Sequence, residues 1–88
     1  MGYKINFTET FSKSFGKLTK IERDRIEKKL EILVINPFHP SLRTKKLKGH
    51  DGKFEFSVNM DIRVIWEYRG DTILLMLDVG HHGILDRY

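Results

Sequence analysis

Three strand-like runs in the second half of the chain constrain its fold more than any other feature. The central run, residues 61–68, is rich in β-branched and aromatic side chains and partly alternates in polarity, which is typical of a half-buried strand. Residues 53–58 precede it and residues 72–79 follow it, with a tight hairpin turn expected at residues 69–71. This arrangement predicts a mainly antiparallel sheet.

The pairing of the first two runs follows from their apolar positions. If residues 59–61 form a three-residue loop, Phe56 pairs with Val64 and Phe54 with Trp66, so that apolar side chains face apolar ones. A loop of two residues would place an apolar side chain opposite a charged one. We therefore predict the three-residue loop.

Arg63 falls on the less apolar face of the central run, because successive side chains alternate between the two faces of a sheet. In the predicted register Ser57 lies across from it, and Lys53 and Glu55 share its face. A guanidinium held there can bind a phosphate or a carboxylate through two parallel hydrogen bonds, or it can pair with a nearby acid such as Glu67. Both alternatives stay open at this point.

The last run is apolar on both faces. On a regular pleat two groups of side chains oppose each other: Leu74 and Met76 on one face, and Ile73, Leu75, Leu77 and Val79 on the other. We therefore expect this strand inside the sheet.

The first half of the chain predicts a short strand at residues 3–7 and then a helix. Thr8 is placed to be the N-cap of this helix. The spacing of Phe11, Phe15 and Leu18 puts all three on one helical face.

A second helix is predicted to begin at Thr19, because Thr19 and Glu22 have the spacing of a capping box. It should end near Asn36, since Pro37 disfavours the helical conformation in the residue before it. The element order β-α-α-β-β-β predicts an α+β fold, with a helical hairpin packed on one face of a mainly antiparallel four-stranded sheet.

Length and composition limit the alternatives. The chain has 88 residues, which suits one small domain spanning residues 1–88. It has no cysteine, which excludes a disulfide framework and a cysteine nucleophile. No apolar run approaches the roughly 20 residues that span a bilayer, so we expect a cytoplasmic protein with no membrane partner.

The formal net charge of +4 is concentrated in one segment, residues 39–53. That segment carries five basic residues against Asp51 alone, while the rest of the chain is balanced. Such clustering is typical of a surface that binds a polyanion, although a solvated lysine loop would have the same composition. The candidate contacts here are Arg43, Lys45, Lys46, Lys48, His50 and Lys53.

The residues after the last strand add groups suited to RNA cleavage. RNA is cut when its 2′-hydroxyl attacks the adjacent phosphate, which requires proton transfer and stabilisation of a crowded phosphorane. Histidine suits the first task and arginine the second, and a tyrosine can stack on a base. Arg63, Tyr88 and one of His81 and His82 supply these groups. Solvated surface histidines are the ordinary alternative, and no metal-binding spacing of histidines occurs.

Several motifs, in order, resemble the RelE/ParE superfamily of bacterial toxin–antitoxin toxins. They are Asn-Pro at residues 36–37, Lys-Leu-Lys-Gly-His-Asp-Gly at 46–52, Asp-Ile-Arg-Val-Ile-Trp-Glu at 61–67, Val-Gly-His-His at 79–82, and Tyr88. The resemblance covers essentially the whole chain.

The resemblance implies an mRNA endoribonuclease that acts on the ribosome by metal-independent 2′-hydroxyl attack, without a cofactor, and that a cognate antitoxin blocks. In its RelE-like branch, Arg63 would contact the scissile phosphate, His82 would stand at a catalytic arginine or histidine position, and Tyr88 would orient the cleaved nucleotide. Together with the basic segment, His81 and Arg87 would contact rRNA or mRNA.

The sequence departs from the family at Glu55 and Ser57, where members commonly carry lysine or arginine. Either nearby lysines compensate, or the activity is weak. Gyrase-poisoning relatives share the fold, so the alternative is a ParE-like gyrase inhibitor, or a catalytically weak member that acts only through antitoxin or other protein binding.

Overall fold

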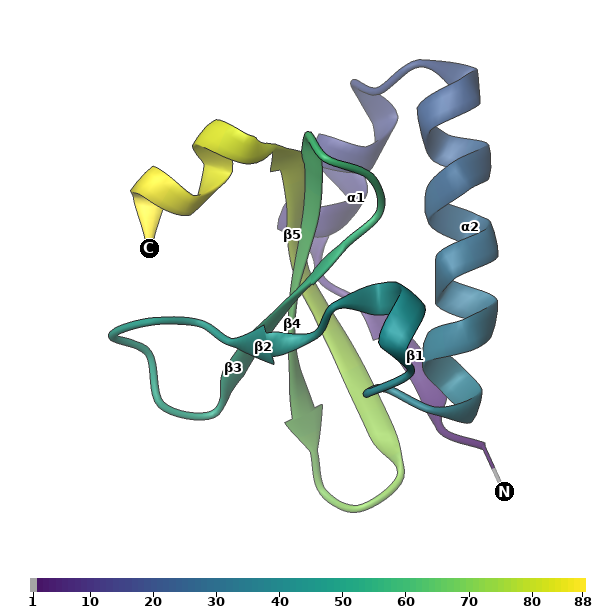
Figure 1. Ribbon diagram of the computed structural model, residues 1–88, viewed down its shortest axis with the longest axis vertical. Helices are drawn as coiled ribbons and strands as arrows, with labels where there is room; N and C mark the ends of the chain where they lie inside the picture. The colour runs from purple at the N-terminus through teal and green to yellow at the C-terminus, as the bar shows by residue number, and fades with distance from the viewer. Residues whose placement is uncertain (1) are drawn as a thin grey trace.

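Within residues 2–88, a helical hairpin packs against a five-stranded sheet in the computed structural model of the chain (Figure 1). The structure describes these residues apart from the side chain of Arg87. The elements are β1 (Lys4–Phe7), α1 (Glu9–Gly16), α2 (Lys20–Ile35), the 3-10 helix η1 (Pro40–Leu42), β2 (Lys45–Lys46), β3 (Lys53–Ser57), β4 (Ile62–Arg69), β5 (Ile73–His81) and the 3-10 helix η2 (His82–Arg87). The predicted α+β class is confirmed. None of the described helices is long and apolar enough to cross a membrane.

Capping side chains begin both helices where the sequence predicted. The Thr8 hydroxyl oxygen accepts the backbone N–H of Phe11 at 3.0 Å at the start of α1. At the start of α2, the Thr19 hydroxyl accepts the N–H of Glu22 at 3.2 Å, and the Glu22 carboxylate accepts the N–H of Thr19 at 2.9 Å. The capping box is therefore confirmed, and α2 ends at Ile35 ahead of Pro37.

The sheet differs from the prediction in strand number and direction. The described strands lie in the order β1-β5-β4-β3-β2, five rather than four. β1 runs parallel to β5, so the sheet is mixed. The additional strand, β2, lies in the segment predicted to be a connector. Lysine has a low strand propensity, so the pairing of Lys45 with Glu55 and of Lys46 with Phe54, rather than a local signal, forms this strand.

The predicted hairpin register between β3 and β4 is confirmed. Phe54 pairs with Trp66, Phe56 with Val64, and Ser57 with Arg63. The pairing of apolar positions was therefore sufficient to fix which residues of these two strands lie side by side.

A β-bulge in β5 overturns the predicted alternation of that strand. Met76 pairs with Trp66, but Asp78 pairs with Ile65, so Leu77 is an extra residue without a partner position in β4. Beyond the bulge the alternation is reversed. Val79, predicted to oppose Leu74 and Met76, instead joins them in the same core.

Thr8 explains why the bulge is stable. Its hydroxyl lies 3.0 Å from the carbonyl oxygen of Met76 and 2.9 Å from that of Leu77, so its hydrogen is shared between two carbonyls at the irregular point of the strand. The backbone N–H of Thr8 also donates to Met76, at 3.1 Å. A residue far away in the sequence therefore supports the bulge, which is why the periodicity of β5 alone did not reveal it.

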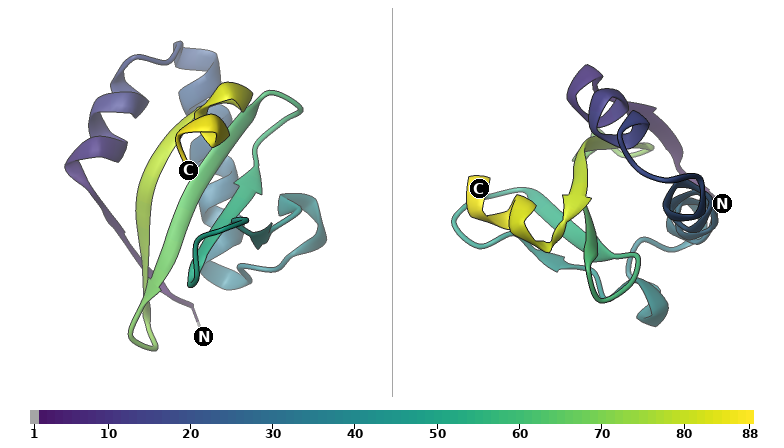
Figure 2. Two further views of the ribbon diagram at one scale, coloured as in Figure 1. Left: turned by 90° about the vertical axis from the view of Figure 1, so that its left-hand side faces the viewer. Right: turned by 90° about the horizontal axis from the view of Figure 1, so that it is seen from above.

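The two faces of the sheet are covered differently, with α2 on one side and η2 on the other (Figure 2). The helix-covered face carries the main core, which includes Phe11, Ile26, Leu33, Phe56, Val64, Trp66, Leu74, Met76 and Val79. The opposite face, called the open face below, holds a smaller cluster of Leu47, Ile65 and Ile84 with Leu77, Leu85 and Tyr88 partly buried against it. The predicted packing of the helical hairpin on one face is confirmed.

Candidate nucleic-acid interface

Arg63 lies on the open face of β4, between Ser57 of β3 and Gly80 of β5. Its Nη1 donates to the carbonyl of Asn59 at 2.7 Å and to that of Ile62 at 3.2 Å, which ties the guanidinium to the β3–β4 turn. The side chain is 15% exposed. Arg63 is therefore held rigidly, with part of its guanidinium at the surface.

Gly80 allows η2 to lie on the open face beside Arg63. A Cβ atom at this position would approach the Ile84 side chain to 3.3 Å, which is tighter than ordinary contact. Since Ile84 is one of the three buried apolar residues of the open face, this close approach anchors η2 there. The glycine that precedes the two histidines thus has a packing role.

A groove of about 340 Å³ adjoins Arg63. Its lining comes from η1 and the residue after it, the end of β3, the β3–β4 turn and β4: Ser41, Arg43, Ser57, Val58, Asn59, Met60 and Arg63. Arg43 has a left-handed backbone, with φ of 52°, and its N–H caps η1 by donating to Pro40 at 3.2 Å. Two guanidinium groups and two hydroxyls lining one groove suit an anionic oxygen group such as a phosphate.

Glu55 places a buried negative charge beside this groove. Its Oε1 lies 4.0 Å from Nε of Arg63 and 3.9 Å from Nζ of Lys45, and the residue is 5% exposed. Among the described residues, this oxygen accepts no hydrogen bond. Two cations predicted to bind RNA therefore share a carboxylate, which offsets part of their charge.

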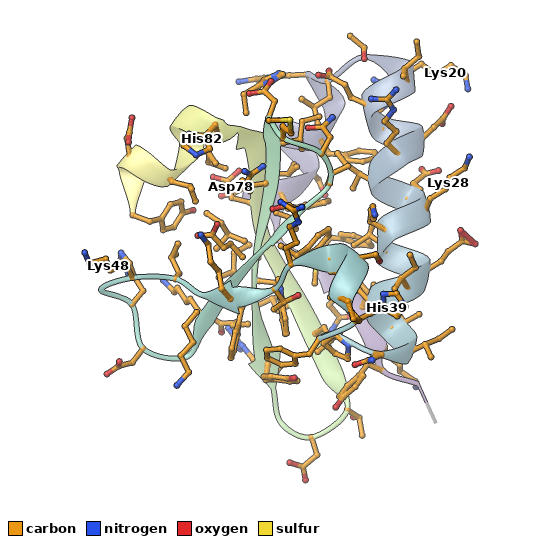
Figure 3. The ribbon with its side chains drawn as sticks, viewed as in Figure 1. Lys20, Lys28, His39, Lys48, Asp78 and His82 are labelled. Atoms are coloured by element: carbon orange, nitrogen blue, oxygen red, sulfur yellow. The ribbon has the colours of Figure 1, made fainter. Side chains whose placement is uncertain are left out.

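The remaining predicted basic contacts gather on the loop between β2 and β3, with buried Leu47 at its base. The Leu47 N–H donates to Lys53 at 2.8 Å, and Gly49 and Gly52 supply the positive φ values of 80° and 78° that the tight loop needs. Figure 3 shows Lys48 at the far end of this loop, pointing into solvent. Together, β2, this loop and the first residue of β3 form residues 45–53, called the basic loop below, which carries Lys45, Lys46, Lys48, His50 and Lys53.

Tyr88 is folded back onto the open face at the base of the basic loop. Its hydroxyl donates to the Oδ2 of Asp78 at 3.2 Å. The centre of its ring lies 5.8 Å from that of His50, edge to face, and 5.9 Å from the Nζ of Lys53. Tyr88 therefore lies with two of the predicted RNA contacts. Arg87, a tail residue also predicted to bind RNA, has its side chain outside the described residues.

His81 forms a clamp between three parts of the chain. Its Nδ1 hydrogen-bonds to the carboxylate of Asp61 in the β3–β4 turn, and its Nε2 lies 3.5 Å from Oε2 of Glu22 in α2. The hydrogen bond to Asp61 is the main cause that raises the pKa of His81 and lowers the pKa of Asp61. Both ring nitrogens of His81 therefore face carboxylates. The predicted contact of His81 with RNA stays a prediction.

His82 lies at the start of η2 with its side chain exposed, and Figure 3 shows it on the η2 side of the molecule with Asp78. Its backbone N–H faces Oδ1 of Asp61 at 3.4 Å. Within the described part of the chain, no hydrogen bond or ion pair joins the His82 ring to Arg63 or Tyr88. The structure thus brings Arg43 to Arg63, and Tyr88 to His50 and Lys53, but it does not bring the three predicted catalytic side chains into contact.

Three acidic residues that organise this region were missed by the sequence analysis: Glu22 as a partner of His81, Asp61 and Asp78. A single acid inside an otherwise apolar strand was a usable signal for Asp78. Glu22 and Asp61 gave no such signal, because their meeting with His81 depends on the tertiary fold. Across residues 2–88, no group of three His, Cys, Asp or Glu side chains is placed to hold a metal ion.

No protein-family model matches the sequence, and no curated protein sequence matches it significantly. Solved structures do match. A chain of the archaeal RelE–RelB complex from Pyrococcus horikoshii OT3 is 22% identical, with a TM-score of 0.77 over 94% of this chain and 98% of that one. A chain of the Escherichia coli DinJ–YafQ toxin–antitoxin complex is 19% identical, with a TM-score of 0.78 over 97% and 98%.

A chain of the RelB–RelE antitoxin–toxin complex from Methanococcus jannaschii is 25% identical, with a TM-score of 0.75 over 93% of this chain and 96% of that one. These likenesses extend over nearly the full length of both partners in each comparison. The resemblance drawn from the sequence motifs is thus confirmed at the level of the fold: the chain has the fold of the RelE-like toxins of toxin–antitoxin systems.

Proposed function

We propose that this protein is the toxin of a toxin–antitoxin system and an endoribonuclease that cleaves mRNA on the ribosome. The observation that carries the proposal is the groove beside Arg63, which arginines from two separate segments line. Lys45 of the basic loop lies near the same carboxylate, that of Glu55, as Arg63 does. The fold, shared with chains of toxin–antitoxin complexes, supports a protein antitoxin as the partner. The +4 net charge supports an RNA partner.

In this proposal the chain's own side chains cleave RNA without a metal ion. The 2′-oxygen attacks the adjacent phosphorus, the bond from phosphorus to the 5′-oxygen breaks, and the products are a 2′,3′-cyclic phosphate and a 5′-hydroxyl. Arg63 and Arg43 stabilise the charge on the phosphorane, His82 transfers a proton, and Tyr88 contacts the nucleotide. η2 begins beside the groove, with the His82 ring exposed at its start. Bound RNA therefore has to draw this ring toward the groove before the proton can be transferred.

Mapping of mRNA 5′ ends after expression in bacteria tests the proposal. We expect new 5′ ends within translated codons, and none in the same transcripts when their start codons are removed. Intact transcripts together with DNA-damage signalling would instead identify a gyrase inhibitor.

A ribosome-bound mRNA assay separates chemistry from binding. We expect His82→Ala to lower the single-turnover cleavage rate by roughly 100-fold or more with little change in ribosome affinity. We expect Lys46→Ala to weaken affinity in a salt-dependent manner while the rate of the bound complex is retained. Arg25→Ala, an exposed cation on α2, is the matched control. An unchanged cleavage rate in His82→Ala would remove its assigned role.

One observation favours a second candidate, a catalytically weak member that acts only through protein binding. The carboxylate of Glu55 offsets part of the positive charge of Arg63 and Lys45. Bound RNA would require a positive surface at this position. In that case the wild-type protein would leave mRNA intact, cause no DNA-damage signalling, and still form a complex with its antitoxin.

A further inference from the structure

We infer that Asp78 is a positioning residue that fixes the ring of Tyr88 on the open face, against the basic loop. The inference rests on the proposed function, in which Tyr88 contacts the nucleotide. Asp78 itself is only 2% exposed, so bound RNA would have almost no access to it. It acts through the hydroxyl of Tyr88.

Both oxygens of the Asp78 carboxylate accept hydrogen bonds. Its Oδ1 accepts the N–H of Val79 at 2.8 Å, and its Oδ2 accepts the Tyr88 hydroxyl at 3.2 Å. A buried carboxylate is costly unless its oxygens receive hydrogen bonds. The buried acid therefore favours the conformation in which Tyr88 is folded onto the sheet.

The bulge in β5 gives Asp78 this orientation. On a regular strand Asp78 would share the face of Met76 and point into the main core, which is built mostly of aliphatic and aromatic side chains that solvate a carboxylate poorly. The extra residue, Leu77, turns Asp78 to the open face opposite Ile65. Because Thr8 supports the bulge from outside the strand, the direction of the carboxylate is built into the framework.

Contacts with two different elements hold the side chain of Tyr88. Its backbone N–H makes a hydrogen bond to Leu85 at 3.1 Å at the end of a single short 3-10 helix. The hydroxyl is fixed by Asp78, while the ring faces His50 and Lys53. One residue thus joins the buried acid to the basic loop, and the ring is oriented before any RNA arrives. Such preorganisation lowers the cost of forming the productive complex.

Nuclear magnetic resonance of the full chain tests the geometry without reference to activity. In the wild type we expect nuclear Overhauser contacts between the Tyr88 and His50 rings. Asp78→Leu should abolish them, whereas Asp78→Asn, which keeps a hydrogen-bond acceptor of the same size, should retain them. Asp86→Asn, an exposed acid in η2, is the matched control. Should Asp78→Leu not fold, Tyr88→Phe removes the same hydrogen bond from the other side and should weaken the ring contacts too.

Cleavage of ribosome-bound mRNA then tests the consequence. Asp78→Leu should lower the single-turnover rate on the order of tenfold, the loss expected for one hydrogen bond to a charged group. The double variant with Tyr88→Phe should cleave no more slowly than Asp78→Leu alone, because both substitutions remove the same hydrogen bond between Tyr88 and Asp78. Asp78→Asn should restore most of the rate, which a merely structural role for the carboxylate would not predict.

The outcomes separate the two proposals. Ring contacts that persist in Asp78→Leu and in Tyr88→Phe, or a wild-type cleavage rate in Asp78→Leu, would overturn the positioning role. An inactive wild type whose ring contacts disappear in Asp78→Leu would confirm the geometry and would reject the endoribonuclease.

Discussion

The helix-covered face and the open face of the sheet use the same strands for opposite purposes. The main core on the helix-covered face is apolar throughout. The buried charged residues of the described chain, Glu55 and Asp78, both lie on the open face, where the apolar cluster is small. The helix-covered face thus supplies most of the apolar packing of the fold, whereas the open face holds its buried charged groups.

The cost of burying charge explains why this division is informative. A buried ion pair often contributes no more to stability than apolar side chains of the same volume would. The open face nevertheless keeps Glu55 near Arg63 and Asp78 near Tyr88. Glu55 thereby lies near one cation of the groove and one of the basic loop, and Asp78 reaches the basic loop through Tyr88. We therefore predict that substitutions on the helix-covered face change stability without changing RNA binding, whereas those on the open face change RNA binding.

The largest effect is expected from Trp66→Ala in the main core. Trp66 is fully buried and stacks on Phe54 with ring centres 4.8 Å apart, so its removal should lower the free energy of unfolding by about 3–5 kcal/mol. Urea denaturation would measure the loss. The folded fraction should bind RNA with unchanged affinity, and a loss of affinity at full folding would break the division between the faces.

Trp66→Phe is the matched control for that substitution. In the described structure the indole N–H has no hydrogen-bond partner, so the change removes apolar volume but no polar interaction. We expect it to cost less than half as much as Trp66→Ala.

Glu55→Gln should have the next largest effect, with opposite signs for stability and binding. Removing the charge near Arg63 and Lys45 should lower stability by roughly 1–3 kcal/mol, since the two cations are only partly desolvated. Glu55→Gln should also tighten RNA binding roughly tenfold, because the charges of Arg63 and Lys45 are then no longer offset and can bind phosphate. Fluorescence anisotropy with a short RNA at fixed salt, together with urea denaturation, measures both quantities. Weaker RNA binding would show that Glu55 orients Arg63 rather than offsetting its charge.

These differences also explain how much of the fold could be predicted. Signals local to a few residues were sufficient where the local interaction decides the structure: the Thr19 and Glu22 capping box and the apolar pairs of β3 with β4. Periodicity failed in β5, because the bulge depends on the hydroxyl of Thr8 from another part of the chain. It also could not assign β1 its parallel partner or detect β2, which strand pairing creates.

The candidate site was predictable only in part, for the same reason. Arg63 could be placed on its face by alternation alone, and the basic loop was visible as a charge cluster. The contact of Tyr88 with Asp78 requires the bulge and the packing of Ile84 against Gly80, which no spacing in the sequence encodes. The pattern of residues therefore predicts which chemical groups could form a site, but it could not place them relative to one another.

A smaller, pH-dependent effect is expected from Asp61→Asn at the edge between the two faces. Asp61 and Glu22 both face His81, and hydrogen bonding to Asp61 raises the pKa of His81 and lowers the pKa of Asp61. The raised pKa stabilises the fold below the ordinary histidine value of about 6.5, and this contribution is lost as the pH rises through the pKa of the folded state. The lowered pKa of Asp61 stabilises the fold above about pH 4, and this contribution is lost as the pH falls through the pKa of Asp61 in the folded state.

The stability difference between the wild type and Asp61→Asn should therefore be greatest between about pH 4 and 6.5 and shrink toward pH 9. Thermal unfolding across that range measures it, with Asp86→Asn as a control that should show no such profile. A difference that is independent of pH would mean that Asp61 acts only through its hydrogen bond to the backbone of His82.

The smallest effect is expected from Lys48→Ala at the end of the basic loop. Lys48 is exposed, so its loss should leave stability unchanged and weaken RNA binding only a few-fold at physiological salt. The slope of log affinity against log salt should fall by about one unit, since a single phosphate contact disappears. Lys28→Ala is the matched control, because Lys28 is an exposed lysine on the outward side of α2, across the molecule from Lys48 (Figure 3). An equal change in slope for both variants would show that RNA responds to the net charge of the whole protein; a change confined to Lys48 would place the bound strand along the basic loop and the open face.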